Sequence, residues 1–104
     1  MLLVRDIWYC KPGKVRALIE KFTAMNKIAG RVGMPTTRLL TDFCAERYWT
    51  LVSEMEVESM AVYENLMSSD GGDPDAMKEM DAIMKDYHDL VESGRREVYK
   101  IEAG

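Results

Sequence analysis

The chain has 104 residues, of which 47% are hydrophobic and 31% are charged, a mixture typical of a single soluble globular domain over residues 1–104. Its mean hydropathy of -0.26, with no apolar run near the roughly 20 residues of a membrane helix, argues against a membrane protein. Fourteen basic against 18 acidic residues give a net charge of -4, which argues against nucleic acid as the main partner because phosphate binding needs a basic surface.

The cysteine content predicts a reducing compartment. Cys10 and Cys44 are too few for a disulfide scaffold, and they fall on strands that a third strand is expected to separate, so both are predicted to be small core residues. The first residues do not form a basic, apolar leader, so we expect a cytoplasmic protein. No group of Cys, His and carboxylate residues has metal-ligand spacing, so no metal is expected.

The first half of the chain predicts a strand, a helix and a hairpin. Residues 2–11 are rich in β-branched and aromatic types and end at a Pro-Gly pair. Residues 14–29 repeat apolar side chains at helical spacing and end at a glycine. Residues 36–44 and 47–57 have strand composition and are separated by only two residues, which indicates a hairpin.

The second half predicts two helices. Ser59 is a suitable N-cap for a short helix over 60–67, which the Ser-Ser-Asp-Gly-Gly stretch at 68–72 ends. Asp73 followed by proline starts a longer helix with a stripe rich in methionine, which is predicted to run to Gly94.

Residues 96–102 complete the pattern as a last strand. The order strand, helix, strand, strand, helix pair, strand is the βαββαβ unit of the ferredoxin-like α+β fold. That fold has a four-stranded antiparallel sheet with its helices on one face. The strands are expected in the spatial order fourth, first, third, second.

The face of the sheet without helices is expected to be polar in a monomer. The predicted strands instead place several large apolar side chains there, namely Ile7, Tyr9, Leu39, Tyr48 and Val52. An exposed apolar face of this kind usually marks an interface. We therefore expect a homodimer whose two sheets pack face to face; the alternative is a mixed face with isolated exposed aromatic residues.

Two stretches resemble NIPSNAP-like proteins. In residues 4–22 (VRDIWYCKPGKVRALIEKF) a strand with an aromatic-rich end leads through Pro-Gly-Lys into an amphipathic helix. Residues 38–66 (RLLTDFCAERYWTLVSEMEVESMAVYENL) are similar to the hairpin, strand end and short helix of the same family. The resemblance implies the dimeric α/β-barrel superfamily, in which two ferredoxin-like sheets pair. Its members include cofactor-independent monooxygenases, haem-degrading oxygenases, isomerases and proteins without known activity.

The resemblance also bears on cofactors. A haem-degrading relative would use a helix histidine, an asparagine in the first strand and a tryptophan on the short helix. His88 is the only histidine, but Asp6 and Tyr63 hold the other two positions. We therefore expect neither haem nor another cofactor.

The candidate catalytic residues are Asp6 and His88. A carboxylate inside an apolar strand suits a general base, and histidine, here at the edge of the apolar helix stripe, is a common general acid or base. As a charge within a strand, Asp6 needs a partner, and so does Arg38. Four partners are possible from the sequence: a ligand, the other residue of the two (Asp6 pairing with Arg38), Arg5 or Arg47. The sequence leaves these alternatives open.

The tryptophans indicate a small-molecule pocket. Trp8 and Trp49 fall on neighbouring predicted strands at the same parity, so they are expected to approach each other. Apolar walls with a few polar groups are typical of ligand sites, and the alternative is a filled aromatic core. The candidate substrate-binding residues are Trp8, Trp49, Tyr63, Met84, Tyr87 and Arg38.

The sequence therefore predicts a NIPSNAP-like protein that binds a small apolar molecule. The leading chemical idea is a cofactor-independent monooxygenase-like reaction on an apolar aromatic or quinol-like substrate, although enzymatic activity itself is left open. The alternative is a non-catalytic module that uses the fold only for dimerisation or assembly.

Overall fold

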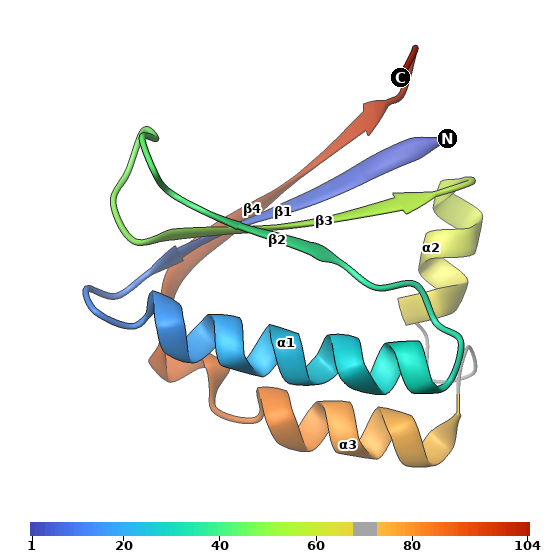
Figure 1. Cartoon of the computed structure of the whole chain (residues 1–104), viewed down its shortest axis with the longest axis horizontal. Coiled ribbons are helices and arrows are strands. Elements are labelled where there is room, and N and C mark those ends of the chain that lie inside the picture. Colours follow the sequence, from blue (N-terminus) through green and yellow to red (C-terminus); the bar gives the residue numbers. More distant parts are fainter. Residues whose placement is uncertain (68–72) are drawn as a thin grey trace.

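Four antiparallel strands form one sheet in the computed structural model of the chain, which describes residues 1–67 and 73–104 (Figure 1). The strands are β1 (Leu2–Cys10), β2 (Arg38–Thr41), β3 (Thr50–Val57) and β4 (Val91–Lys100). Their order in the sheet is β2-β3-β1-β4. This is the predicted order, so the ferredoxin-like α+β fold is confirmed.

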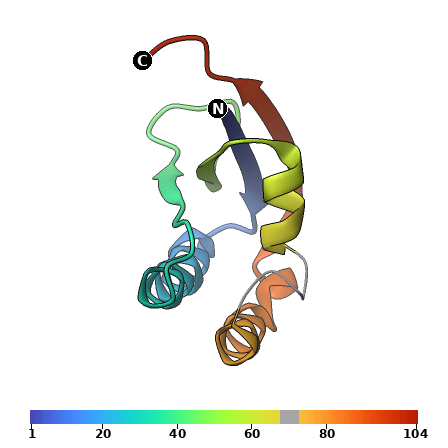
Figure 2. The same cartoon turned by 90° about the vertical axis from the view of Figure 1, so that its right-hand side faces the viewer.

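The helices lie on one side of the sheet. They are α1 (Val15–Arg31), α2 (Met60–Met67) and α3 (Pro74–Met84), followed by the 3-10 turn η1 (Tyr87–Asp89). Figure 2 shows α1 and α3 side by side below the sheet, with α2 close to the strands. One sheet face is therefore covered by helices, and we call the opposite one the helix-free face.

Both predicted helix starts in the second half are confirmed. The Ser59 hydroxyl accepts a hydrogen bond from the backbone N–H of Val62 at 3.2 Å. The Asp73 carboxylate accepts from the N–H groups of Asp75 at 2.8 Å and Ala76 at 3.3 Å. These bonds satisfy donors that the first turn of a helix leaves unpaired. The break predicted at 68–72 lies outside the described residues.

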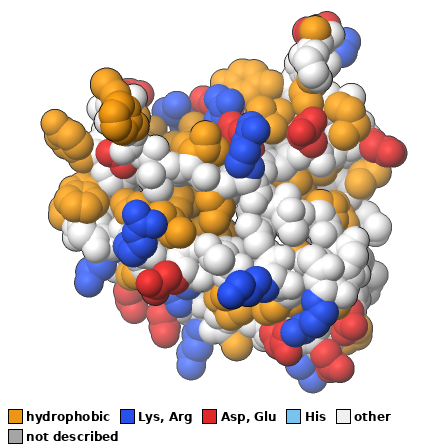
Figure 3. Space-filling view, viewed as in Figure 1, with side chains coloured by type: hydrophobic (Ala, Val, Ile, Leu, Met, Phe, Trp, Pro, Cys, Tyr) orange, Lys and Arg blue, Asp and Glu red, His pale blue; other side chains and the backbone are white. Residues whose placement is uncertain are grey.

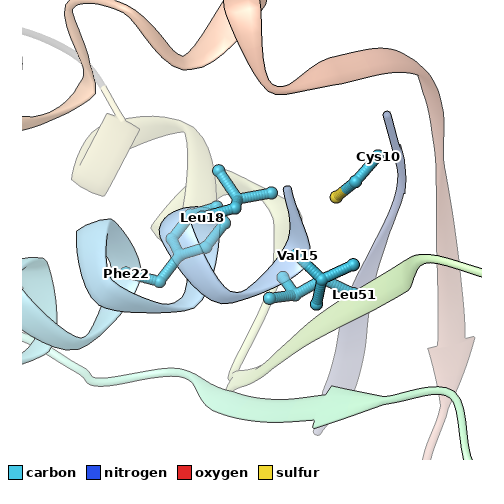
Figure 4. Close-up of a cluster of buried hydrophobic side chains, with 5 residues drawn as sticks. All are labelled: Cys10, Val15, Leu18, Phe22 and Leu51. Carbon is cyan, nitrogen blue, oxygen red and sulfur yellow. The ribbon is translucent and has the colours of Figure 1, made fainter. Parts of the chain in front are cut away.

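The core consists of three groups of buried side chains rather than one. The first joins β1, α1 and β3 through Cys10, Val15, Leu18, Phe22 and Leu51 (Figure 4). A second lies between α1 and α3 and contains Ile28, Ala29, Ala76 and Met80. The third joins the sheet to α2 through Val4, Val57 and Tyr63.

The predicted long second helix is wrong beyond Met84. The helix ends there, and β4 begins at Val91 because this strand pairs with β1 along its whole length. Gly94 therefore lies inside a strand and does not end a helix. A Cβ atom at Gly94 would lie 2.9 Å from the backbone oxygen of Ile7, so the glycine permits close approach of two strands.

The predicted tight hairpin is also wrong, because residues 42–49 form a longer connection between β2 and β3. An Asp42 carboxylate oxygen accepts a hydrogen bond from the N–H of Thr50 at 2.9 Å and so replaces a strand-to-strand bond. Trp49 has a φ of 60°, a left-handed conformation that a strand does not use. Cys44 is exposed in this loop, whereas Cys10 is buried as expected.

The helix-free face combines apolar and charged side chains. Ile7 and Val52 are paired neighbours at its centre, and Leu40 pairs with Val52. Leu39 points to the helix side instead, where it packs against the first core group, which corrects one expected member of this face. Tyr48 is exposed in the loop. Figure 3 shows hydrophobic side chains gathered where Figure 1 places this loop.

Glu54 is the buried charge of the helix-free face. It is 6% exposed and accepts hydrogen bonds from Arg5 at 2.7 Å and from Arg38 at 2.5 Å. Hydrogen bonding by Arg38 is the main effect that lowers the pKa of the Glu54 carboxyl, and the bond from Arg5 adds to it against the opposing effect of burial. The ionised carboxylate therefore stabilises this part of the sheet.

We expect Glu54→Gln to lower the free energy of unfolding at neutral pH by about 1–2 kcal/mol, because two guanidinium groups lose a charged acceptor. A carboxyl whose pKa is lowered by folding contributes stability above its unfolded pKa of about 4.3, and this is lost as the pH falls through the lower folded value. The difference from the wild type should therefore shrink in acid.

Urea unfolding curves between pH 3 and pH 7 measure this difference. Glu92→Gln, which changes an exposed carboxylate with only a 3.5 Å contact to Arg47, is the matched control and should cost little. A deficit of Glu54→Gln that stayed constant at all these pH values would contradict the assigned role of the ionised carboxylate.

Candidate functional site

A cavity of about 280 Å³ lies between the sheet and the helices, and we call it the central cavity. All three helices contribute to it, together with β1, β3, β4 and the loop before β2. The described lining residues are Val4, Asp6, Trp8, Phe22, Met25, Asn26, Ala29, Met34, Pro35, Thr37, Ser53, Met55, Tyr63, Met67, Met80, Met84 and Arg96. Such a concave, mainly apolar space with a few polar groups is typical of small-molecule sites.

Methionine provides much of the apolar wall. Six of the nine methionines line the central cavity, and they come from both halves of the chain: Met25, Met34, Met55, Met67, Met80 and Met84. An unbranched thioether side chain is flexible and polarisable, so it adapts to different ligand shapes. The predicted methionine stripe on α3 therefore supplies only two members of a larger group.

Trp8 forms the aromatic part of the wall. Its ring centroid lies 5.4 Å from that of Phe22 and 5.9 Å from that of Tyr87, the latter in an edge-to-face arrangement. Its indole N–H points to the Ser53 hydroxyl at 3.4 Å, a long hydrogen bond. Tyr87 is not among the described lining residues; it contacts Trp8 and so holds the indole in position.

Asp6 and Arg96 form the charged end of the central cavity. They are directly paired on β1 and β4, and both carboxylate oxygens accept from the guanidinium, at 2.6 Å and 3.2 Å. The bond to Asp6 is the main effect that raises the pKa of Arg96. The Asp6 side chain is 21% exposed and that of Arg96 52%, so the carboxylate is the deeper of the two groups.

Tyr63 lies beside this pair. It is 6% exposed, and the Arg96 guanidinium lies 5.1 Å from the centroid of its ring, within reach of a cation–π contact. Burial is the main effect that raises the pKa of the Tyr63 phenol, and the charge of Asp6 adds to it. The hydroxyl therefore remains protonated at neutral pH and is available as a donor.

Asn26 and Thr37, two further polar residues of the cavity, are hydrogen-bonded to each other. The Asn26 amide donates to the Thr37 carbonyl at 2.9 Å and accepts from the Thr37 N–H at 2.9 Å and hydroxyl at 3.2 Å. These bonds fix the loop before β2 to α1. Asp6 and Arg96 are the only charged residues among the described lining.

The structure brings together only part of the predicted site. Asp6, Trp8, Tyr63 and Met84 line the central cavity. The other four predicted members do not, namely Tyr87, which contacts Trp8 from outside the lining, and Trp49, Arg38 and His88.

Trp49 does not approach Trp8 as expected. It lies in the loop before β3 and borders a separate open hollow with Arg16 and Tyr48. His88 is exposed in η1, with its ring against that of Tyr87 at 4.0 Å. The sequence predicted His88 on a helix that continues past Met84. The helix ends at Met84, and His88 lies in the 3-10 turn that follows. Arg38 lies on the helix-free face and binds Glu54.

Sequence reasoning missed Arg96, although a signal for it exists. Once β1 and β4 are taken as antiparallel neighbours, a charge on the helix-facing side of β1 requires an opposite charge on the facing strand. The alternatives predicted for Asp6 were a ligand, Arg38, Arg5 and Arg47, and the structure shows Arg96 instead. The strand pattern predicted Met55 of β3 on the helix-facing side, and it does line the cavity. Met34, in the loop before β2, had no such signal, because its position depends on how the loop folds against α1.

In the described part of the chain, no group of three or more His, Cys, Asp or Glu side chains could hold a metal ion. None of the described helices is long and apolar enough to cross a membrane.

Neither a protein-family model nor a curated protein sequence matches the chain, but solved structures do. An uncharacterised NIPSNAP domain protein from Burkholderia xenovorans is 13% identical, with a TM-score of 0.72 over 99% of this chain and 96% of that one. A NIPSNAP family protein from Agrobacterium tumefaciens is 11% identical, with a TM-score of 0.63 over 95% and 90%.

A third structure, from Nitrosomonas europaea, is named as a proposed antibiotic biosynthesis monooxygenase. It is 11% identical, with a TM-score of 0.63 over 99% of this chain and 100% of that one. At such identities a structural likeness establishes the fold, not the activity. The chain therefore has the ferredoxin-like fold of these NIPSNAP and monooxygenase structures along nearly its whole length, which confirms the resemblance seen in the sequence at the level of the fold.

Proposed function

We propose that the protein binds a small, mainly apolar molecule in the central cavity. The observation that carries this proposal is one cavity between sheet and helices, walled by six methionines and Trp8, with a single charged pair at its end. Members of all three core groups border this space. The likeness to NIPSNAP structures supports the fold that forms the cavity.

Binding is tested with a neutral apolar fluorophore, N-phenyl-1-naphthylamine, in the Trp49→Phe background, so that Trp8 is the only tryptophan. We expect saturable quenching of Trp8 fluorescence, because Trp8 lines the central cavity. Ala29→Leu adds three carbons to the cavity wall and should weaken binding by about tenfold or more, since it occupies volume needed by the ligand.

Ala61→Leu, the same substitution at an exposed position of α2, is the matched control and should bind as the background does. Circular dichroism verifies that both variants fold. Equal affinity of the two variants, or quenching that does not saturate, would contradict the central cavity as the binding site.

As the catalytic form of this proposal, the protein carries out a cofactor-independent, monooxygenase-like reaction on an apolar aromatic or quinol-like substrate. Asp6 is the one carboxylate among the described lining residues, and it would accept a proton from the bound substrate. Tyr63 and Arg96 lie beside it as donors. The exposed position of His88 gives it no part in this step.

Oxygen uptake with 1,4-naphthoquinol, corrected for the uncatalysed rate, tests the catalytic form. We expect Asp6→Asn to lower the catalysed rate by about 100-fold or more, because an amide does not accept the proton. Asp89→Asn, an exposed substitution in η1, should leave the rate unchanged. If the wild type adds nothing to the uncatalysed rate, the catalytic form is wrong and ligand binding alone remains.

The alternative function, a module for self-association, is favoured by a different observation. The helix-free face carries Leu40, which is 40% exposed, and the loop beside it carries Phe43, which is fully exposed. We propose that two copies pair through this face in a cytoplasmic homodimer. The charged centre of the face is neutralised within each copy, since Glu54 is bound by Arg5 and Arg38, so two copies can meet there without an unpaired carboxylate.

Light scattering measures this association, and we expect a dimer at micromolar concentration. Leu40→Glu should shift the protein towards a monomer, because it places a charge in an apolar contact. Val62→Glu changes an equally exposed side chain, also 40%, on α2, and should leave the dimer intact. A monomeric wild type would overturn the proposal, as would a shift of the same size in both variants.

A further inference from the structure

The charged end of the central cavity carries no surplus charge. Asp6 and Arg96 are the only charged residues among the described lining, and they neutralise each other through two hydrogen bonds. An ionic ligand would have to leave water for a mainly apolar cavity without an unpaired counter-charge. Burying an ion in this way is costly, so the cavity disfavours both anions and cations.

The pair nevertheless retains hydrogen-bonding capacity. Each Asp6 carboxylate oxygen can accept a second hydrogen bond, since Arg96 donates only one to each oxygen. The guanidinium has five N–H donors, of which the Asp6 carboxylate takes two. A neutral group that donates one hydrogen bond and accepts another therefore fits this end. Asn26 and Thr37 do not compete for this ligand group because they are bonded to each other.

The relative depth of the two groups sets the direction of the main contact. Asp6 is the more buried member, and the Arg96 side chain lies further out, against the ring of Tyr63. A ligand in the cavity therefore meets the Asp6 carboxylate as a hydrogen-bond acceptor at this end, with the Arg96 guanidinium beside it as a donor. A carboxylate ligand would face the Asp6 oxygens, with repulsion that water screens only in part because the site is partly buried.

We infer that the Asp6–Arg96 pair selects by charge: the central cavity takes an uncharged ligand with an apolar body and a terminal hydroxyl that donates to Asp6. This inference rests on the proposed binding function and names the ligand class for the same cavity. The proton-accepting role of Asp6 is not required for it.

The experiment uses four probes with one apolar body: 2-naphthylmethanol, 2-naphthoate, 2-naphthylmethylammonium and naphthalene. Affinities are measured at pH 7 by quenching of Trp8 in the Trp49→Phe background. We expect the alcohol to bind about tenfold or more tightly than either ion, and more tightly than naphthalene, which lacks the hydroxyl.

Two variants invert the selectivity in opposite directions. Asp6→Asn leaves Arg96 without its counter-charge, so naphthoate should gain about tenfold and the alcohol should lose affinity. Arg96→Gln leaves Asp6 unpaired, so the ammonium probe should gain by a similar factor. Arg95→Gln is the matched control: it is the same substitution at the preceding residue of β4, whose side chain borders a hollow on the helix-free face together with Arg5 and Ile7. It should leave all four affinities unchanged.

The outcomes separate this inference from the proposed function. If none of the probes binds the wild type, ligand binding in the cavity itself fails. If the probes bind but an ion binds as tightly as the alcohol, the cavity stands and charge selection is overturned. Charge selection is equally overturned if Asp6→Asn and Arg96→Gln shift all probes alike, since a purely structural pair would weaken the site without changing its preference.

Discussion

The central position of β1 determines where every functional group of this molecule lies. The strand pairs with β3 over Leu2–Tyr9 and with β4 over Leu2–Cys10, so both of its edges are fixed by hydrogen bonds. Successive side chains point to opposite faces of the sheet. Asp6 and Trp8 therefore face the helices, whereas Arg5 and Ile7 face away, and a slip by one residue would exchange these two sets.

The central cavity follows from the way the helices cover this sheet. One core group joins α1 to the middle strands, another joins α1 to α3, and a third joins α2 to the sheet. The three groups share no buried residue, although Met25 packs against both the first and the second. Phe22, Met80 and Tyr63, one from each group, border the same cavity. Methionine suits such a boundary because it fills irregular space without fixing its shape.

Much of the fold could be predicted from the sequence, because local signals agreed with the tertiary structure. The β-branched and aromatic composition of β1, the apolar stripe of α1 and the caps at Ser59 and Asp73 each predicted the element that is present. The errors occurred where long-range contacts overrule local preference. Gly94 resembles a helix end, but the pairing of β4 with β1 requires a glycine inside the strand.

The same distinction explains the candidate site. Asp6, Trp8, Tyr63 and Met84 were predicted because their elements and faces were correct. Trp49 was misplaced because aromatic composition favours a strand, whereas the Asp42 carboxylate bonds the Thr50 N–H and the loop remains outside the sheet. His88 was misplaced because the helix period was extended beyond the last helical turn.

Adjacent residues of β1 form separate ion pairs on the two faces of the sheet. Arg5 binds Glu54 on the helix-free face, and Asp6 binds Arg96 on the cavity side. The backbone of the sheet lies between these pairs, so a change in one alters the chemistry of its own face first. The proposed ligand selection and the proposed self-association therefore depend on different side chains. Structures about 10% identical to this chain share its fold, and fold alone does not determine what each of them binds.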